Sequence, residues 1–373
     1  MTPNGLGIQV DTERGPDQSI ARLGCARTAF VGRTLRGPLN RPVLLTSFNE
    51  FQHLFGGLWQ PSPLGYAVEH FFDNGGREAI IVRVANGARA PTLTLGAGGH
   101  RLTLRARRPG SREFLRASVD YDNIPPAVAS EFNLTVQRVR SRGTAQVEDQ
   151  EIYARLSVLP EADRYMGLAL RGSELVELAA PIPPQRPDRT LDASSGMPTG
   201  YVESNADGDD GAPLSDYDLI GSNADRTGLF ALEGADYFNL LCIPPLSREA
   251  DVGHCVLMVA ARYCRQRRAM LLVDPPAAWH TADDALRGLR EWSVSSEDAV
   301  MYFPRILVLD KLRGHFESFA GGGAVAGLLA RSDEHFLVWG LEKNENAVLR
   351  PGYRPSCRVP ENKRLRQIGR AHV

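Results

Sequence analysis

The chain has 373 residues, of which 43% are hydrophobic and 23% are charged, and this length predicts two or three domains in a globular protein. The formal net charge of −1 excludes a general electrostatic attraction to nucleic acid or to anionic membranes. No apolar run approaches the roughly 20 residues that span a bilayer, so we expect no membrane insertion, and the first residues show no signal-peptide pattern.

Residues 1–25 are expected to form an extended N-terminal arm. One short alternating piece, Ile8-Gln9-Val10, lies there among polar and turn residues. A strand of that length is not stable in isolation. We therefore expect it to pair with the body of its own chain or with another chain.

Residues 26–88 are expected to form the first part of an α/β core. Buried strands are predicted at 29–32, 42–45 and 78–85, with helices near 48–55 and 64–73. Ser47 and Glu50 have the spacing of a capping box before the first helix, and Gly56-Gly57 ends it. The order of strand, helix, helix and strand is typical of an α/β fold.

In residues 89–190, apolar and polar residues alternate with a period of two, in segments separated by Gly, Pro and Asn. This pattern predicts an inserted antiparallel β domain. Residues 191–213 are rich in Asp, Gly, Ser and Pro and are expected to form a flexible loop.

Residues 214–367 return to an α/β pattern and are expected to form the second, incomplete part of the core. Apolar strands are predicted within 236–245, 267–276 and 298–310, with helices near 249–266 and 281–292 between them. Alternating strands and helices indicate a parallel sheet with right-handed crossovers. The predicted fold class is therefore mixed α/β, with a core built from segments on either side of an inserted antiparallel β domain.

Three aspartates are candidates for a metal site. Asp274 and Asp310 follow predicted strands, and Asp225 precedes the segment 226–232. Carboxylates near the ends of parallel strands could hold a divalent metal for hydrolysis. The alternative is that an aspartate after a strand caps a turn, as the sequence Asp274-Pro275-Pro276 favours.

Gly321-Gly322-Gly323 precedes a predicted short helix and could cradle a phosphate on exposed N–H groups. The Lys and Ser or Thr of a nucleotide P-loop do not follow, so the alternative is a loop that requires close backbone approach. No G-x-S-x-G elbow occurs, and the following histidines do not accompany a nucleophile in a known pattern: His254, His280, His315 and His335.

The cysteines do not form a metal-binding or disulfide pattern. Their number is odd, no pair has C-x-x-C spacing, and His254-Cys255 with Cys264 lacks the second pair of ligands that a zinc site needs. Free thiols are expected at Cys25, Cys242, Cys255, Cys264 and Cys357. The sequence thus gives no positive sign of an enzyme, and we expect no cofactor or metal.

Five stretches of the sequence occur in a characteristic order. They are "AFVGRTLRGPLNRPVLLTSFNEFQHLFGGL" and "LGYAVEHFFDNGGREAIIVRVA", then "DGAPLSDYDLIGSNADRTGLFALEGADYFNLLCIPPL", "AVMYFPRILVLD" and "GGGAVAGLLARSDEHFLVWGLEKNENAVL". In this order they resemble contractile tail sheath proteins, which form the sheaths of contractile phage tails and of phage-tail-like injection particles. The resemblance covers residues 5–360 and rests on the order of the motifs, since one alone would be weak.

The resemblance implies a structural subunit that polymerises helically around an inner tube and contracts. It implies other sheath subunits, the inner tail tube protein, and baseplate and tail terminator proteins as partners, and a virion tail or injection particle assembled in the bacterial cytoplasm. In that family the N-terminal arm adds a strand to a neighbour's sheet. Here this role falls to Gly7, Ile8, Gln9, Val10 and Asp11.

Two alternatives remain open at this point. One is a metal-dependent hydrolase that uses Asp225, Asp274 and Asp310. The other is a tail adaptor or baseplate protein with a sheath-like core.

The C-terminal end departs from the family, whose members continue well beyond the position of Arg366. The last residues, "IGRAHV", also match what a common short-read sequencing adapter encodes in one frame. We therefore expect a C-terminally truncated sequence in which residues 368–373 are an artefact.

Overall fold

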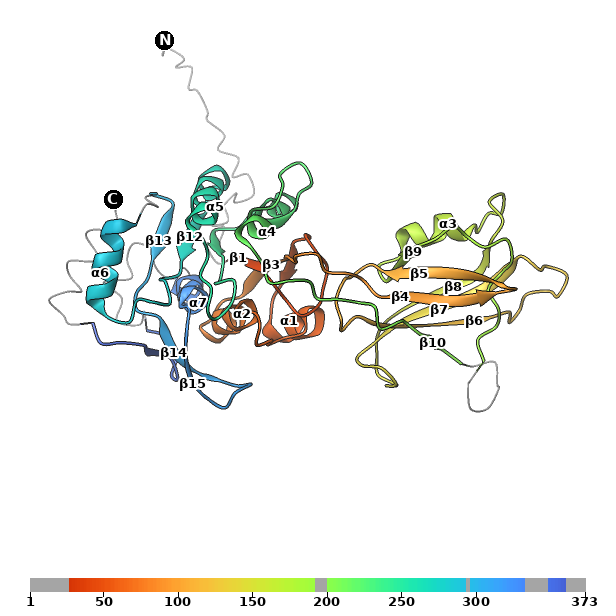
Figure 1. The fold of residues 1–373 in the computed structure, drawn as a ribbon, viewed down its shortest axis with the longest axis horizontal. Coiled ribbons are helices and arrows are strands. Elements are labelled where there is room, and N and C mark those ends of the chain that lie inside the picture. The colour runs from red at the N-terminus through yellow and green to blue at the C-terminus, as the bar shows by residue number, and fades with distance from the viewer. Residues whose placement is uncertain (1–26, 192–199, 293–295, 333–347, 360–373) are drawn as a thin grey trace, which may run out of the picture.

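The computed structural model describes residues 27–191, 200–292, 296–332 and 348–359. These residues form an elongated molecule with an α/β part at one end and a β-rich part at the other (Figure 1). The two parts are joined by extended segments, which run side by side between them in the same view.

A six-stranded sheet forms the centre of the α/β part. Its order is β13-β12-β11-β1-β3-β2, and every pairing is parallel except that of the edge strand β2 with β3. The strands are β1 (Arg27–Gly32), β2 (Val43–Leu45), β3 (Glu78–Arg83), β11 (Leu240–Cys242), β12 (Met270–Val273) and β13 (Ala299–Met301). Because β1 pairs with β11, one sheet joins segments that lie about 200 positions apart in the chain, as a core built on either side of an insertion requires.

Helices cover both faces of this sheet, because its strands are apolar on both sides. Val31 and Leu241 belong to the core under α4 (Asp216–Ile220), the 3₁₀ helix η2 (Gly228–Gly234) and α5 (His254–Arg267). Phe30 and Leu272 belong to the opposite core, under α1 (Phe48–Phe55), α2 (Leu64–Asp73) and α7 (Gly322–Ser332). A further helix, α6 (Ala282–Glu291), follows β12.

The start of α1 differs in one detail from the predicted capping box. The Ser47 side chain accepts a hydrogen bond from the Glu50 N–H at 3.3 Å, as expected. The Glu50 carboxylate, however, accepts from the N–H of Thr46 at 2.7 Å instead of that of Ser47. The predicted helix end is confirmed, since Gly56 adopts the left-handed conformation at φ 91°.

The segment 298–310 is not one strand, as its apolar composition suggested, but two strands in different sheets. β13 ends at Met301, and β14 (Ile306–Asp310) pairs instead with β15 (His315–Phe319) and β16 (Arg354–Pro355) in an antiparallel sheet. Pro304 lies between β13 and β14, and proline has no N–H with which to continue a ladder.

Two antiparallel sheets pack face to face in the β-rich part. One contains β4 (Thr92–Ala97), β5 (His100–Ala106) and β9 (Val176–Leu178), and the other contains β10 (Val202–Glu203), β6 (Phe114–Asp120), β7 (Glu131–Val139) and β8 (Val147–Ser157). Leu95 and Leu104 of the first sheet share a buried core with Leu134 of the second. The short helices α3 (Met166–Ala169) and η1 (Leu170–Gly172) contribute Met166 and Leu170 to that core.

β8 is the one long strand of this part that the sequence did not predict. Its segment "VEDQEIYARLS" carries four charged side chains, and most of its residues are exposed or partly exposed. A strand at the edge of a sheet is often charged, because charge discourages pairing with other chains. The missing apolar stripe therefore reflects the edge position of β8 next to β7.

A buried arginine holds the two parts of the molecule together. Arg83 is 1% exposed, and its Nη1 donates to the carbonyl oxygens of Gly37 and Pro109, both at 2.7 Å. Burial lowers the pKa of Arg83 to about 10. Arg36 adds an ion pair with Glu148 of β8 at 2.6 Å, both side chains being largely buried.

The described residues of the segment 191–213, for which we expected a loop, make specific contacts with the β-rich part. β10 pairs with β6. The Asp207 carboxylate accepts from the N–H and the hydroxyl of Thr92 at 2.9 and 2.6 Å. Asp210 does the same for Ser111 at 2.8 and 2.7 Å. The aspartates that made this segment look like a solvated loop thus serve as acceptors for backbone groups.

Candidate functional site

The three candidate metal ligands lie in different environments. Asp225 is exposed in a turn before η2. Asp274 follows β12 and accepts a hydrogen bond from the Gly322 N–H, whereas Asp310 ends β14 in the other sheet and bonds to Arg248. In the described part of the chain, no three His, Cys, Asp or Glu side chains are grouped as metal ligands. The structure therefore contradicts the shared metal site on which the hydrolase alternative depends.

The glycine-rich turn and the helix that follows it pack closely against α2. A Cβ atom on Gly323 would lie 2.1 Å from the Ala67 oxygen, and one on Gly327 would lie 2.2 Å from the Phe71 oxygen. The N–H of Gly322 is already bound to Asp274 at 2.7 Å. The interpretation as a loop that needs close backbone approach is confirmed, because α7 lies directly against the backbone of α2.

Asp274 caps the N-terminus of α7 from the end of β12. Burial raises the pKa of the Asp274 carboxyl to about 6, although the Gly322 N–H and the nearby Arg305 guanidinium act in the opposite direction. A carboxylate near a helix N-terminus satisfies an N–H group that has no partner within the helix. Asp274 thus has a capping role, but it caps a helix 48 residues further along the chain and not the turn after its own strand, as its Asp-Pro-Pro context had suggested.

We expect Asp274→Ala to lower the free energy of unfolding by about 1–2 kcal/mol, because the Gly322 N–H loses its acceptor. Asp274→Asn keeps an acceptor oxygen and should cost less.

The Asp274 carboxyl should also make stability depend on pH. In the wild type its folded-state pKa is raised, so between about pH 4 and 6 the folded state binds more protons than the unfolded state. The contribution of Asp274 to stability therefore falls as the pH rises. Urea unfolding at several pH values checks this. The same pH slope in the wild type and in Asp274→Asn would contradict it.

A buried polar network attaches the β14–β15 hairpin to α2 and to the loop before α5. The Asp310 carboxylate is 0% exposed and accepts from Arg248 Nη2 at 2.5 Å, from the Tyr66 hydroxyl at 3.1 Å and from the Leu312 N–H at 2.8 Å. Burial alone would raise the pKa of Asp310, but the Leu312 N–H and Arg248 hold it below its usual value. The aspartate is therefore an ionised anchor of the hairpin.

Three further ion pairs extend this network toward the surface. Glu317 of β15 bonds to both Arg248 and Arg313, the latter at 2.8 Å. Lys311, in the turn of the hairpin, bonds to Glu69 of α2 at 2.8 Å. The hairpin and α2 are thus linked at the C-terminal end of β14, through Asp310 and Lys311.

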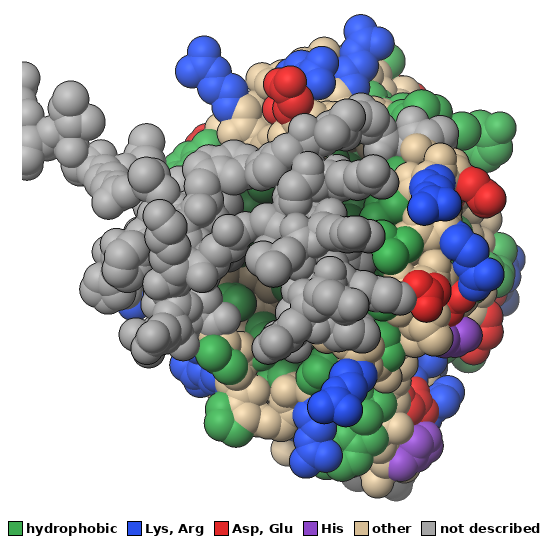
Figure 2. Space-filling view, turned by 90° about the vertical axis from the view of Figure 1, so that its left-hand side faces the viewer, with side chains coloured by type: hydrophobic (Ala, Val, Ile, Leu, Met, Phe, Trp, Pro, Cys, Tyr) green, Lys and Arg blue, Asp and Glu red, His purple; other side chains and the backbone are tan. Residues whose placement is uncertain are grey.

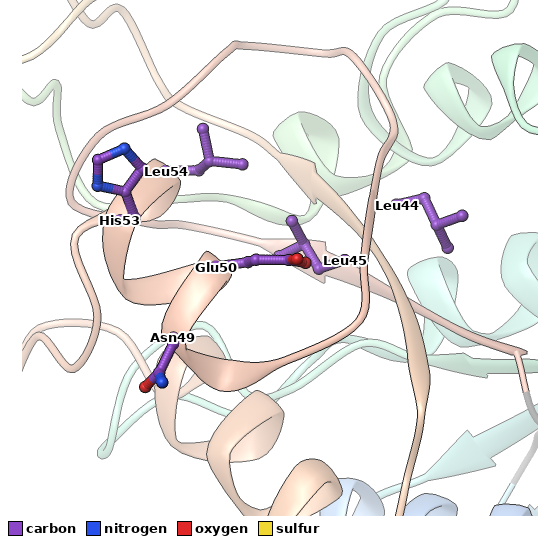
Figure 3. A pocket seen from close by; sticks show the side chains of 6 residues that line it. All are labelled: Leu44, Leu45, Asn49, Glu50, His53 and Leu54. Atoms are coloured by element: carbon purple, nitrogen blue, oxygen red, sulfur yellow. The ribbon is translucent and has the colours of Figure 1, made fainter. Parts of the chain in front are cut away.

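A shallow apolar depression lies beside the edge strand β2. Leu44, Leu45 and Leu54 line it, and the other lining residues are Asn49, Glu50 and His53. Figure 3 shows Glu50 pointing from α1 toward Leu45, whereas Asn49 points away from the strand. Leu44 is 47% exposed on the outermost strand of the sheet. An exposed apolar sheet edge is a surface at which another chain can pair.

The end of the molecule that carries α6 presents mixed charges. Figure 2 shows basic and acidic side chains next to one another among hydrophobic ones on the described surface of this end. This distribution agrees with the net charge of −1.

Some predicted features lie outside the described residues. These are the arm residues Gly7, Ile8, Gln9, Val10 and Asp11, together with Cys25 and His335. The four described cysteines are free thiols, as predicted: Cys242, Cys255, Cys264 and Cys357. Within the described ranges, we found no helix with the length and apolar character needed to cross a bilayer.

The arrangement of helices and strands is similar to that of a known protein. The sheath tail protein Lin1278 from Listeria innocua aligns with 93% of this chain and 64% of its own, at a TM-score of 0.54 and 12% sequence identity. The chain has the tail sheath fold. The fold implied by the sequence motifs is thereby confirmed.

Two other solved structures are also similar, at lower TM-scores. The sheath tail protein DSY3957 from Desulfitobacterium hafniense aligns with 86% of this chain and 62% of its own, at 13% identity and a TM-score of 0.47. The sheath complex of an extracellular contractile injection system, PVC, in the contracted state aligns with 98% of this chain and 60% of its own, at 10% identity and a TM-score of 0.44. This chain therefore spans less than two thirds of the length of these sheath proteins.

Sequence-based comparisons found nothing comparable. No protein-family model matches the chain, and no curated protein matches it.

Proposed function

We propose that this chain is a structural subunit of a contractile tail sheath, which polymerises helically around an inner tube and contracts to drive that tube through a target envelope. The observation that carries the proposal is the tail sheath fold, shared with the Listeria innocua protein over 93% of this chain. The ordered sheath motifs in the sequence support it independently.

The internal contacts suit a subunit that moves as one body. Arg83 and the Arg36–Glu148 pair fix the β-rich part to the α/β part, and the Asp310 network fixes the hairpin. We propose residues 26–88 and 214–367 as the sheath core and residues 89–190 as an inserted domain followed by a loop at 191–213. Rigid subunits that change only their mutual contacts allow a helical array to shorten without unfolding.

The proposed partners are other copies of the chain, the inner tail tube protein, and baseplate and tail terminator proteins. Contacts between copies would be heterologous, since such contacts generate open helices when the rotation does not close. The proposed location is a virion tail or a contractile injection particle assembled in the bacterial cytoplasm. The proposed role is structural and not enzymatic, and the aspartates that could have formed a catalytic site are accounted for by hydrogen bonds in the case of Asp274 and Asp310.

We propose that the arm, residues 1–25, pairs with a neighbouring subunit through the segment from Gly7 to Asp11. Deleting residues 1–22 should leave the subunit folded and abolish tubes. Ile8 and Val10 bury too little apolar surface to offset an ordering cost of about 1–2 kcal/mol per residue within one subunit. Hydrogen exchange checks this, because strong protection of the amides from Ile8 to Val10 in the monomer would contradict exchange between subunits.

The proposed assembly is tested by electron microscopy of the expressed and purified protein. We expect helical tubes or stacked rings. A product that remains monomeric at all concentrations and salt conditions tested would count strongly against the proposal.

A further inference from the structure

A second, polar cavity lies next to the Asp310 network. It has a volume of about 210 Å³ and lies between the start of α2, the loop before α5 and strand β15. This volume leaves room for several water molecules or for a small charged group. Its charged lining residues are Arg248, Arg305, Arg313, Glu249 and Glu317.

Most of these charges already have partners. Arg248 binds Asp310 and Glu317, and Arg313 Nη1 lies 2.8 Å from the Glu317 carboxylate. The Glu249 carboxylate accepts a hydrogen bond from the Ser247 hydroxyl at 3.1 Å. Arg305 differs from the other two arginines in its hydrogen bonds: the shortest that its side chain makes to a described residue is 3.4 Å, although the Asp251 and Asp274 carboxyl groups lie nearby.

Arg305 is buried but only weakly bonded. Its side chain is 9% exposed, its Nη1 lies 3.4 Å from the Pro275 oxygen, and the Asp251 carboxylate is 3.8 Å away. Charge-assisted hydrogen bonds usually measure about 2.7–2.9 Å. Asp251 is also engaged by the Ala277 N–H at 2.9 Å. A buried guanidinium has five donors, and this one makes no short bond to an acceptor among the described residues. Such a group is expected to bind an anion where a cavity gives access.

We propose that this cavity binds an oxyanion, with Arg305 as its main cation. Ser318, which lines the cavity from β15, can donate its hydroxyl to the same group. A carboxylate side chain of a second copy and a free phosphate offer the same chemistry. The first source rests on the proposed function, whereas the second does not.

The first test measures binding to the full chain by calorimetry with inorganic phosphate and, separately, acetate. If the anion is free, Arg305→Gln should weaken binding at least about tenfold, which corresponds to the loss of one charge-assisted hydrogen bond. Arg290→Gln, at an exposed position of α6, is the matched control and should bind like the wild type. Because Arg305→Gln could unfold the chain, Ser318→Asp provides a second variant. It leaves Arg305 in place and supplies a competing carboxylate, so it should also block binding.

The second test follows assembly by sedimentation and electron microscopy. If the anion is a carboxylate of another copy, the wild type binds no small anion in the first test, and Arg305→Gln and Ser318→Asp reduce assembly while Arg290→Gln does not. A wild type that binds phosphate but never assembles would refute the proposed function and support the anion site. Two results together would overturn the anion site. The wild type would bind neither phosphate nor acetate, and the variants Arg305→Gln and Ser318→Asp would show the same assembly behaviour as the wild type.

Discussion

Replacing Gly327 by alanine is expected to lower the free energy of unfolding by about 3 kcal/mol, at the upper end of the usual cost of overpacking. The added Cβ would lie 2.2 Å from the Phe71 carbonyl oxygen, and a backbone atom cannot move aside as a flexible side chain can. The intrinsic preference of helices for alanine over glycine, about 1 kcal/mol, offsets only part of this cost. Gly323→Ala should lower the free energy of unfolding by a similar amount, because its Cβ would lie 2.1 Å from the Ala67 oxygen.

Chemical denaturation of the two variants checks the effect, and Gly172→Ala is the matched control. A Cβ on Gly172 meets no atom within 4 Å, so this variant should unfold close to the wild-type midpoint. If Gly327→Ala were as stable as Gly172→Ala, the close contact between α2 and α7 would be wrong.

Replacing Arg248 by alanine is expected to have the other large effect. The change leaves the fully buried Asp310 carboxylate without its cation, and breaking a buried pair from one side typically costs about 3–5 kcal/mol. The Tyr66 hydroxyl and the Leu312 N–H remain as donors, so we expect the lower part of that range. Adding Asp310→Asn to Arg248→Ala should recover part of the loss, because the stranded charge is then removed.

Arg313→Ala is the control for this prediction. Arg313 also binds Glu317, but its side chain is 39% exposed, so its loss should cost less than about 1 kcal/mol. Thermal unfolding of the wild type, Arg248→Ala, the double variant Arg248→Ala with Asp310→Asn, and Arg313→Ala separates these contributions to stability. Equal losses in Arg248→Ala and Arg313→Ala would contradict the anchoring role of Asp310.

The elements of the α/β part could be predicted because local signals agree with the tertiary structure there. Ser47 and Gly56 mark the ends of α1, and Phe51 and Phe55 mark its buried face. The division of residues 298–310 into two strands was missed, because Pro304 was outweighed by the apolar residues on both sides. β8 was missed because an edge strand lacks the apolar alternation by which strands are predicted.

The candidate site could be predicted only in part. The sequence drew attention to Asp274, Asp310 and the glycine-rich turn, but it could not show what each would contact. Asp310 meets Tyr66, which is distant in the chain, and Asp274 meets Gly322. The underbonded Arg305 gave no sequence signal, since an arginine before an apolar strand is more often exposed. Such contacts between residues distant in the chain depend on tertiary structure and leave no local pattern in the sequence.

Helical reconstruction from electron micrographs of the assembled protein would show whether the chain is a sheath subunit. We expect a hollow tube whose repeating unit fits the six-stranded sheet together with the β-rich part. We also expect the tube to be lost when residues 1–22 are deleted. A compact closed oligomer, or a tube whose repeating unit does not fit this fold, would contradict the assignment of the chain as a sheath subunit.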